Sequence, residues 1–83
     1  MMVMKPYAQW HNYETWNVAN DMHKNTQIHQ WAVDFMKTYT GEDAYGDFVT
    51  DYGLISTSDG VLYGDSVIKN SELSEMMKGL IEL

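Results

Sequence analysis

The chain has 83 residues, enough for one small domain with a modest core. It carries a formal net charge of −7, it contains no cysteine, and its five basic residues are all lysines. These features exclude disulfides and thiolate metal sites, argue against direct binding of nucleic acid or an anionic membrane, and favour a partner protein with a basic surface.

The N-terminal segment, residues 1–10, is expected to be extended, because Pro6 lacks a backbone N–H and biases Lys5 away from the helical conformation. This segment has no apolar run long enough for a signal peptide, and no later segment could span a bilayer. We therefore expect a soluble cytoplasmic protein whose single domain covers residues 1–83.

The first helix is predicted over residues 12–25. Asn12 is a suitable N-cap, and Glu14 follows in the first turn, where the helix dipole favours an anion. Tyr13 and Trp16 fall near one face of this helix. We therefore expect Trp16 to anchor the helix in the core, with Tyr13 beside it.

The second helix has the clearest apolar pattern of the chain. Thr26 can cap it, and Gly41 is a reasonable C-terminal stop. Between these two residues, six side chains recur at the spacing of one buried helical face. They are Ile28, Trp31, Ala32, Phe35, Met36 and Tyr39.

A third helix is predicted over residues 42–52, with Gly53 ending it. Four carboxylates lie along this helix: Glu42, Asp43, Asp47 and Asp51. The three aspartates recur every four residues, so they would form one acidic ridge with neighbours roughly 5–6 Å apart. Two interpretations stay open. The ridge is either a solvated face that favours solubility or an imitation of the regularly spaced charges of duplex DNA.

The segment 54–63 reads as a small β-hairpin, because short β-prone runs flank the turn sequence "SDG", with an irregular loop as the alternative. The last helix is capped by Asn70 or Ser71 and continues to the chain end. The fold class is therefore mainly α, a compact bundle of three or four helices with a hairpin. The expected core consists of Trp16, Ile28, Trp31, Phe35, Phe48, Leu73, Met76, Met77 and Leu80.

The three histidines do not predict a metal site. His23 and His29 are six residues apart, which would place them on different sides of a continuous helix, and no pair has the spacing of a helical zinc site. We expect neither a metal nor a cofactor. His11 and Glu14 are candidates for an acid–base pair, but their surroundings are typical of a helix start, so an enzyme is not expected.

Three stretches carry a resemblance to a known family. They are "NYETWNVA" (12–19), "SDGVLYGDS" (58–66) and "ELSEMMKGLIEL" (72–83). Together they resemble a family of small uncharacterised proteins from bacteriophages and other microbes. The resemblance implies a small accessory protein of a phage or mobile element and assigns no catalytic residues.

The leading functional hypothesis is a non-enzymatic, phage-type inhibitor that binds a host protein, for example a CRISPR or restriction complex. Its proposed binding residues are Glu42, Asp43, Asp47 and Asp51, whose carboxylates would replace phosphates in a basic groove. The alternative is a homo-oligomeric module. Eleven aromatic residues exceed what one small core can hide, and exposed rings would pair two chains, for example as a homodimer.

Overall fold

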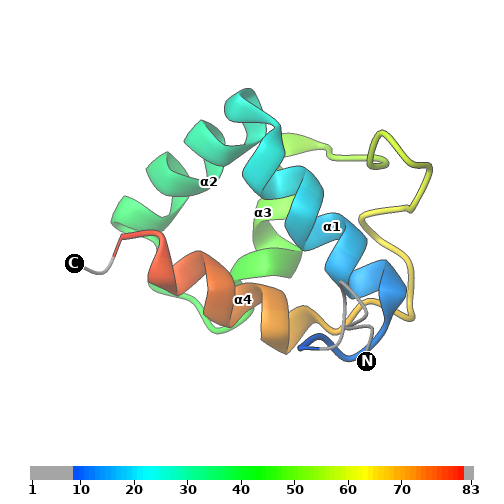
Figure 1. The fold of residues 1–83 in the computed structure, drawn as a ribbon. Helices are drawn as coiled ribbons and strands as arrows, with labels where there is room; N and C mark the ends of the chain where they lie inside the picture. The colour runs from blue at the N-terminus through cyan, green and yellow to red at the C-terminus, as the bar shows by residue number, and fades with distance from the viewer. Residues whose placement is uncertain (1–8, 82–83) are drawn as a thin grey trace, which may run out of the picture.

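Four helices make up the regular structure of the described part of the chain. The structure, a computed structural model, describes residues 9–81. The helices are α1 (Tyr13–Lys24), α2 (Thr26–Thr38), α3 (Ala44–Tyr52) and α4 (Asn70–Gly79). In Figure 1, α1 and α2 meet at a sharp corner, α3 lies behind them, and α4 crosses below. The prediction of a mainly α fold is confirmed. The extended segment predicted for residues 1–10 falls largely outside the described residues.

A single residue forms the corner between α1 and α2. The backbone N–H of Asn25 donates to the carbonyl oxygen of Asp21 at 2.8 Å, which closes the last turn of α1. The side-chain oxygen of Asn25 accepts from the N–H groups of Gln27 and Ile28 at 3.1 and 3.2 Å, which caps α2. The predicted cap, Thr26, is instead the first helical residue, because the amide of Asn25 already satisfies these donors.

The ends of the later helices differ from the predicted ones by a few residues. Helix α2 ends before Tyr39 rather than at Gly41. Helix α3 begins two residues later than predicted and ends at Gly53, as expected, where φ is +62° and glycine carries little strain. Helix α4 has Lys69 as its N-cap without a side-chain hydrogen bond, so the predicted capping by Asn70 or Ser71 is wrong.

The predicted hairpin is not present as a pair of strands. Within residues 9–81, the only β pairing is one isolated antiparallel bridge between Ser56 and Leu62. The hydroxyl of Thr57 accepts from the N–H groups of Asp59 and Val61, so a side chain closes the turn. The segment then bonds to α1 rather than extending its own ladder, and it forms a long loop, residues 53–69, beside that helix (Figure 1).

The core lies between the four helices and the loop, and it differs in part from the predicted one. Its largest fully buried side chains include Tyr45 and Tyr63, neither of which was predicted. Trp16 is wrong as a core anchor, since it is only partly buried and packs on Tyr13 with ring centroids 5.7 Å apart. The buried face of α1 lies elsewhere. The buried apolar residues are Val18, Ala19, Met22, Ile28, Ala32, Met36, Ala44, Tyr45, Phe48, Tyr63, Ile68, Leu73 and Met77.

Candidate partner-binding surface

Two of the four carboxylates in the predicted acidic ridge accept hydrogen bonds from other residues of the chain, and the other two do not. Asp43 stands before the first residue of α3, and its Oδ1 accepts from the N–H of Gly46 at 3.0 Å, so it is the N-cap. Asp47 lies in the first turn, and its Oδ2 accepts a 2.6 Å hydrogen bond from the hydroxyl of Tyr39. Because Tyr39 follows α2, this bond ties the side of α3 that carries Asp47 to the end of α2.

The other two carboxylates face solvent. Glu42 and Asp51 are exposed, and neither carboxylate makes a hydrogen bond or an ion pair with any residue in the range 9–81. Asp51 is one helical turn beyond Asp47 and therefore lies on the same side of α3. Together we name Glu42, Asp43, Asp47 and Asp51 the α3 carboxylates.

The lysines of the described chain do not neutralise the α3 carboxylates. The ion pairs among residues 9–81 join Lys37 to Asp34 at 3.5 Å and Lys78 to Glu75 at 3.6 Å. Both are i, i+3 pairs on exposed helical surfaces, where such pairs contribute little to stability. The negative charge around α3 is therefore left to solvent, and it produces a negative field at this end of the molecule.

The hydrogen bond to Asp47 is the main cause that raises the pKa of the Tyr39 phenol from 10.0 to about 12. Desolvation and the charges of Asp47 and Asp43 raise it further, and a backbone hydrogen bond at Asp43 acts in the opposite direction. A deprotonated phenol would meet the carboxylate of Asp47 at hydrogen-bonding distance and repel it. The neutral phenol is thus the form that the α3 carboxylates favour.

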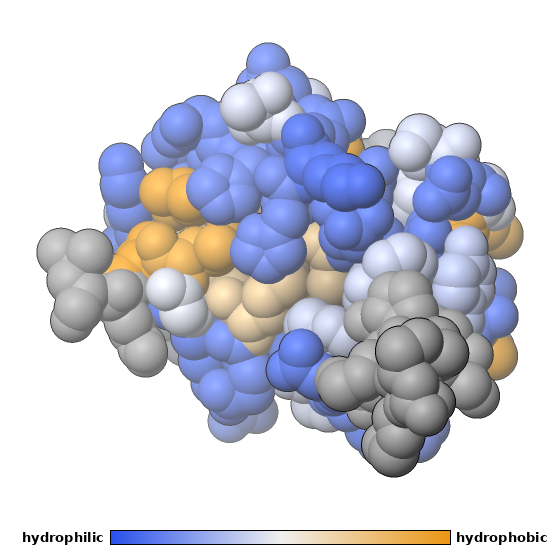
Figure 2. Space-filling view, in the orientation of Figure 1, coloured by the Kyte–Doolittle hydropathy of each residue, from blue (hydrophilic) through white to orange (hydrophobic). Residues whose placement is uncertain are grey.

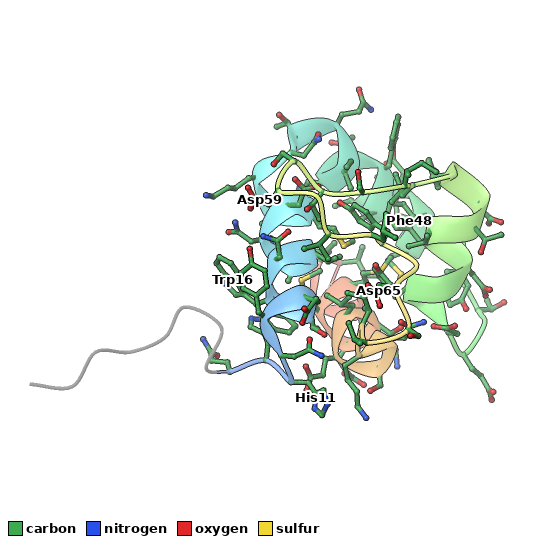
Figure 3. All side chains as sticks on the ribbon, turned by 90° about the vertical axis from the view of Figure 1, so that its right-hand side faces the viewer. His11, Trp16, Phe48, Asp59 and Asp65 are labelled. Atoms are coloured by element: carbon green, nitrogen blue, oxygen red, sulfur yellow. The ribbon has the colours of Figure 1, made fainter. Side chains whose placement is uncertain are left out.

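Partly exposed aromatic rings adjoin the α3 carboxylates. The ring centroids of Trp31 and Tyr52 are 5.3 Å apart, those of Phe35 and Tyr39 are 5.0 Å apart, and those of Phe35 and Tyr52 are 6.2 Å apart. Figure 3 shows Phe48 on the inner side of α3. Its buried ring packs against those of Phe35 and Tyr52, with centroids 5.4 and 4.9 Å apart. We name Trp31, Phe35, Tyr39 and Tyr52 the aromatic face.

A second group of polar side chains joins α1 to the loop. The side-chain oxygen of Asn17 accepts from the hydroxyl of Thr57 at 2.6 Å, and its amide donates to Asp59 at 2.7 Å. Asn17 and Thr57 are almost completely buried, at 1% and 5% exposure. Figure 3 places Asp59 beside α1. These bonds hold the loop against the helix.

The buried tyrosines extend this group through the core. The hydroxyl of Tyr63 donates to Oδ2 of Asp21 at 2.6 Å, and the hydroxyl of Tyr45 donates to the carbonyl oxygen of Tyr63 at 2.6 Å. Burial raises the pKa of both phenols, and for Tyr63 the hydrogen bond to Asp21 and the charge of that carboxylate raise it further. Both tyrosines are therefore held in the neutral form.

The capping residue of α1 anchors the far end of the loop. Oδ1 of Asn12 accepts from the N–H and hydroxyl of Thr15, which confirms the predicted cap, and its amide donates to the carbonyl oxygen of Val67 at 2.7 Å. The hydroxyl of Thr15 in turn accepts from the N–H of Lys69 at 2.9 Å. Within residues 9–81, every buried side-chain polar atom has a partner. The polar residues of the opening motif thus hold the fold together.

The alternative catalytic pair is not joined by a bond. The backbone N–H of His11 donates to Oε1 of Glu72 at 2.8 Å, and its ring makes no hydrogen bond to Glu14. The break at Asn25 brings the rings of His23 and His29 to 6.0 Å, which the spacing along a continuous helix did not predict. No group of three or more potential metal ligands occurs in the range 9–81.

Two open hollows have none of the α3 carboxylates in their linings. One, of about 380 Å³, is lined by Gln9, Trp10, Ser71, Glu72 and Glu75. The other, of about 400 Å³, lies between α3 and the loop, and its lining includes Tyr45, Tyr63 and Asp65. Glu72 and Asp65 each accept a hydrogen bond from a backbone N–H, at 2.8 and 3.0 Å, so these carboxylates have a structural role within the chain.

The chain matches no protein-family profile, no curated protein and no solved structure. The resemblance carried by the opening motif therefore stays a prediction. Across residues 9–81, no helix is long and apolar enough to cross a membrane.

Proposed function

We propose that this protein is a non-enzymatic, phage-type inhibitor that covers a basic, nucleic-acid-binding surface of a host protein. The α3 carboxylates would take the places of phosphates in that surface. CRISPR and restriction complexes are the class of partner with the required chemistry, because they hold nucleic acid in grooves rich in lysine and arginine.

The observation that carries the proposal is the uncompensated charge around α3. Glu42 and Asp51 are exposed without a cationic partner among the described residues, and Asp47 is exposed beside them. Their negative field would speed encounter with a basic surface. Asp43 adds charge but is also needed as a cap, so it contributes to binding and to stability alike.

The test compares two variants that each remove two negative charges. Asp47→Asn/Asp51→Asn neutralises the exposed side of α3, and Glu14→Gln/Glu75→Gln neutralises carboxylates on α1 and α4. Each variant is immobilised and exposed to a bacterial lysate, and bound proteins are identified by mass spectrometry. A captured protein is then purified, and its binding of duplex DNA is measured with and without the inhibitor.

We expect wild type and the Glu14/Glu75 variant to retain the same nucleic-acid-binding protein and to compete with DNA for it. The Asp47/Asp51 variant should lose about tenfold or more in affinity, with a weaker dependence on salt. Equal retention by both variants, or a partner whose DNA binding is unaffected, would show that the α3 carboxylates do not act as phosphate mimics.

An apolar band favours the second candidate function, a homo-oligomeric module. Figure 2 shows this band between polar side chains on the face formed by α1, α2 and α4. Ile81, next to the end of α4, is 41% exposed. Bands of this kind often mark subunit contacts. Light scattering after size exclusion at increasing concentration tests it, and a constant monomer mass would exclude it.

A further inference from the structure

The aromatic face and the α3 carboxylates form one continuous surface. The 2.6 Å bond from Tyr39 to Asp47 joins them directly, and Phe35 stacks on the ring of Tyr39. Asp51 precedes Tyr52 in the last turn of α3, and its side chain leaves the helix about 100° around the axis from the ring of Tyr52. The same surface therefore combines aromatic rings with negative charge.

The rings of this surface are only partly covered by the chain. Trp31, Phe35 and Tyr39 are half-buried, and Tyr52 is 37% exposed. An exposed aromatic group costs solvation free energy that a purely solubilising acidic surface would avoid. Tryptophan and tyrosine are also the residues most often found at the centres of protein interfaces. The rings therefore indicate a contact surface, and the carboxylates beside them favour a positively charged partner.

We infer that the aromatic face binds arginine side chains of a partner protein. A guanidinium group is planar, so it stacks on the face of Tyr52 while its N–H groups donate to the neighbouring Asp51 in a bidentate arrangement. Lysine offers a compact charge that can pair with the carboxylates but cannot stack. An apolar peptide would leave the carboxylates unpaired. This inference rests on the proposed function and specifies the chemistry of its partner.

The test uses the full chain with two peptides of equal charge, octa-arginine and octa-lysine. Affinities are measured by calorimetry, and the indole N–H signal of Trp31 is followed by NMR. We expect octa-arginine to bind about threefold or more tightly than octa-lysine, because stacking contributes about two- to fivefold at exposed sites. The Trp31 signal should shift with octa-arginine.

Substitutions separate the aromatic contribution from the charge. Tyr52→Leu keeps apolar volume but removes the ring, and Tyr13→Leu does the same at an exposed tyrosine of α1, 42% exposed against 37%. Tyr52→Leu should reduce octa-arginine binding about two- to fivefold and weaken octa-lysine binding less, because only the guanidinium group stacks. Tyr13→Leu should change neither. Thermal unfolding of each variant establishes that the fold is retained.

The outcomes distinguish this inference from the proposed function. If Asp47→Asn/Asp51→Asn weakens both peptides while Tyr52→Leu changes neither, the carboxylates bind cations and the aromatic face does not select arginine. If the Asp47/Asp51 variant binds as tightly as Glu14→Gln/Glu75→Gln, both proposals fail. Equal affinities for the two peptides, or a shift of another indole in place of that of Trp31, also overturn the inference.

Discussion

Asn17 and Thr57 share a buried 2.6 Å hydrogen bond although they stand forty positions apart in the sequence. The bond joins the middle of α1 to the tip of the loop, and the amide of Asn17 also donates to Asp59. Thr57 uses the same hydroxyl to accept two backbone N–H groups of its own turn. Asn17 therefore holds the tip of the loop against α1, while Thr57 sets the shape of the turn.

Replacing Asn17 should destabilise the protein strongly. Asn17→Ala leaves the buried hydroxyl of Thr57 without its acceptor and removes a partner of the exposed Asp59, so the free energy of unfolding should fall by about 2–3 kcal/mol. Urea unfolding followed by circular dichroism measures it. Asn20→Ala, on the same helix at a side chain bonded to no described residue, should stay within about 0.5 kcal/mol of wild type. Equal losses would contradict the role given to Asn17.

Stability should fall in alkaline solution. The pKa values of Tyr39, Tyr45 and Tyr63 are raised above 10.0 in the fold, so the folded state holds phenolic protons that the unfolded state releases. Their contribution is fully present below about pH 10 and is lost as pH rises further. Urea unfolding measured between about pH 9 and pH 12 should show a stability that is constant up to about pH 10 and falls steeply above it, and Tyr63→Phe should make this decline shallower. A flat profile for wild type would refute the assignment.

Asp43 and Asp51, at the two ends of α3, should differ in their contribution to stability. Asp43→Ala removes the N-cap and should lower the free energy of unfolding by about 1 kcal/mol. Asp51→Ala removes an exposed side chain without a described partner and should stay within about 0.5 kcal/mol of wild type. Thermal unfolding separates them. If Asp43→Ala is as stable as Asp51→Ala, the capping bond does not stabilise α3.

The two glycines at 53 and 64 provide a test of backbone strain. Gly53 has φ of +62° with open space around its Cα, so Gly53→Ala meets no atoms and costs only the left-handed conformation, about 1 kcal/mol. Gly64 also has open space but no positive φ, so Gly64→Ala should be neutral or slightly stabilising. Chemical denaturation of both variants checks this difference, and an equal response would mean that φ at Gly53 is not the cause.

The helices could be predicted from the sequence because their signals are local. Apolar spacing located α2 and α4, the caps Asn12 and Gly53 were correct, and the exposure of Asp47 follows from its place on α3. The loop could not be predicted, because "SDG" carries the local signal of a hairpin while its actual partners lie on α1.

In the opening motif, residues 12–19, the sequence predicted the wrong residues to be buried. Its aromatic residues Tyr13 and Trp16 suggest a core, yet its buried residues include Thr15 and Asn17. A buried asparagine is costly unless it is bonded, and its partners at Thr57 and Asp59 become visible only in three dimensions. Likewise, three rings of the aromatic face, Trp31, Phe35 and Tyr39, belong to the predicted buried stripe of the second helix, and the fourth, Tyr52, is brought to them by α3.

Because Asn25 alone connects α1 to α2, the number of residues at this corner determines which face of α2 packs on the core. An α-helix turns by about 100° per residue, so one residue inserted after Asn25 would rotate α2 about its axis by roughly a quarter turn. Trp31 and Phe35 would then move away from Tyr52, and Ile28 and Ala32 would leave the core. Insertions and deletions are therefore excluded at this corner, even where many substitutions on the helix surfaces are neutral.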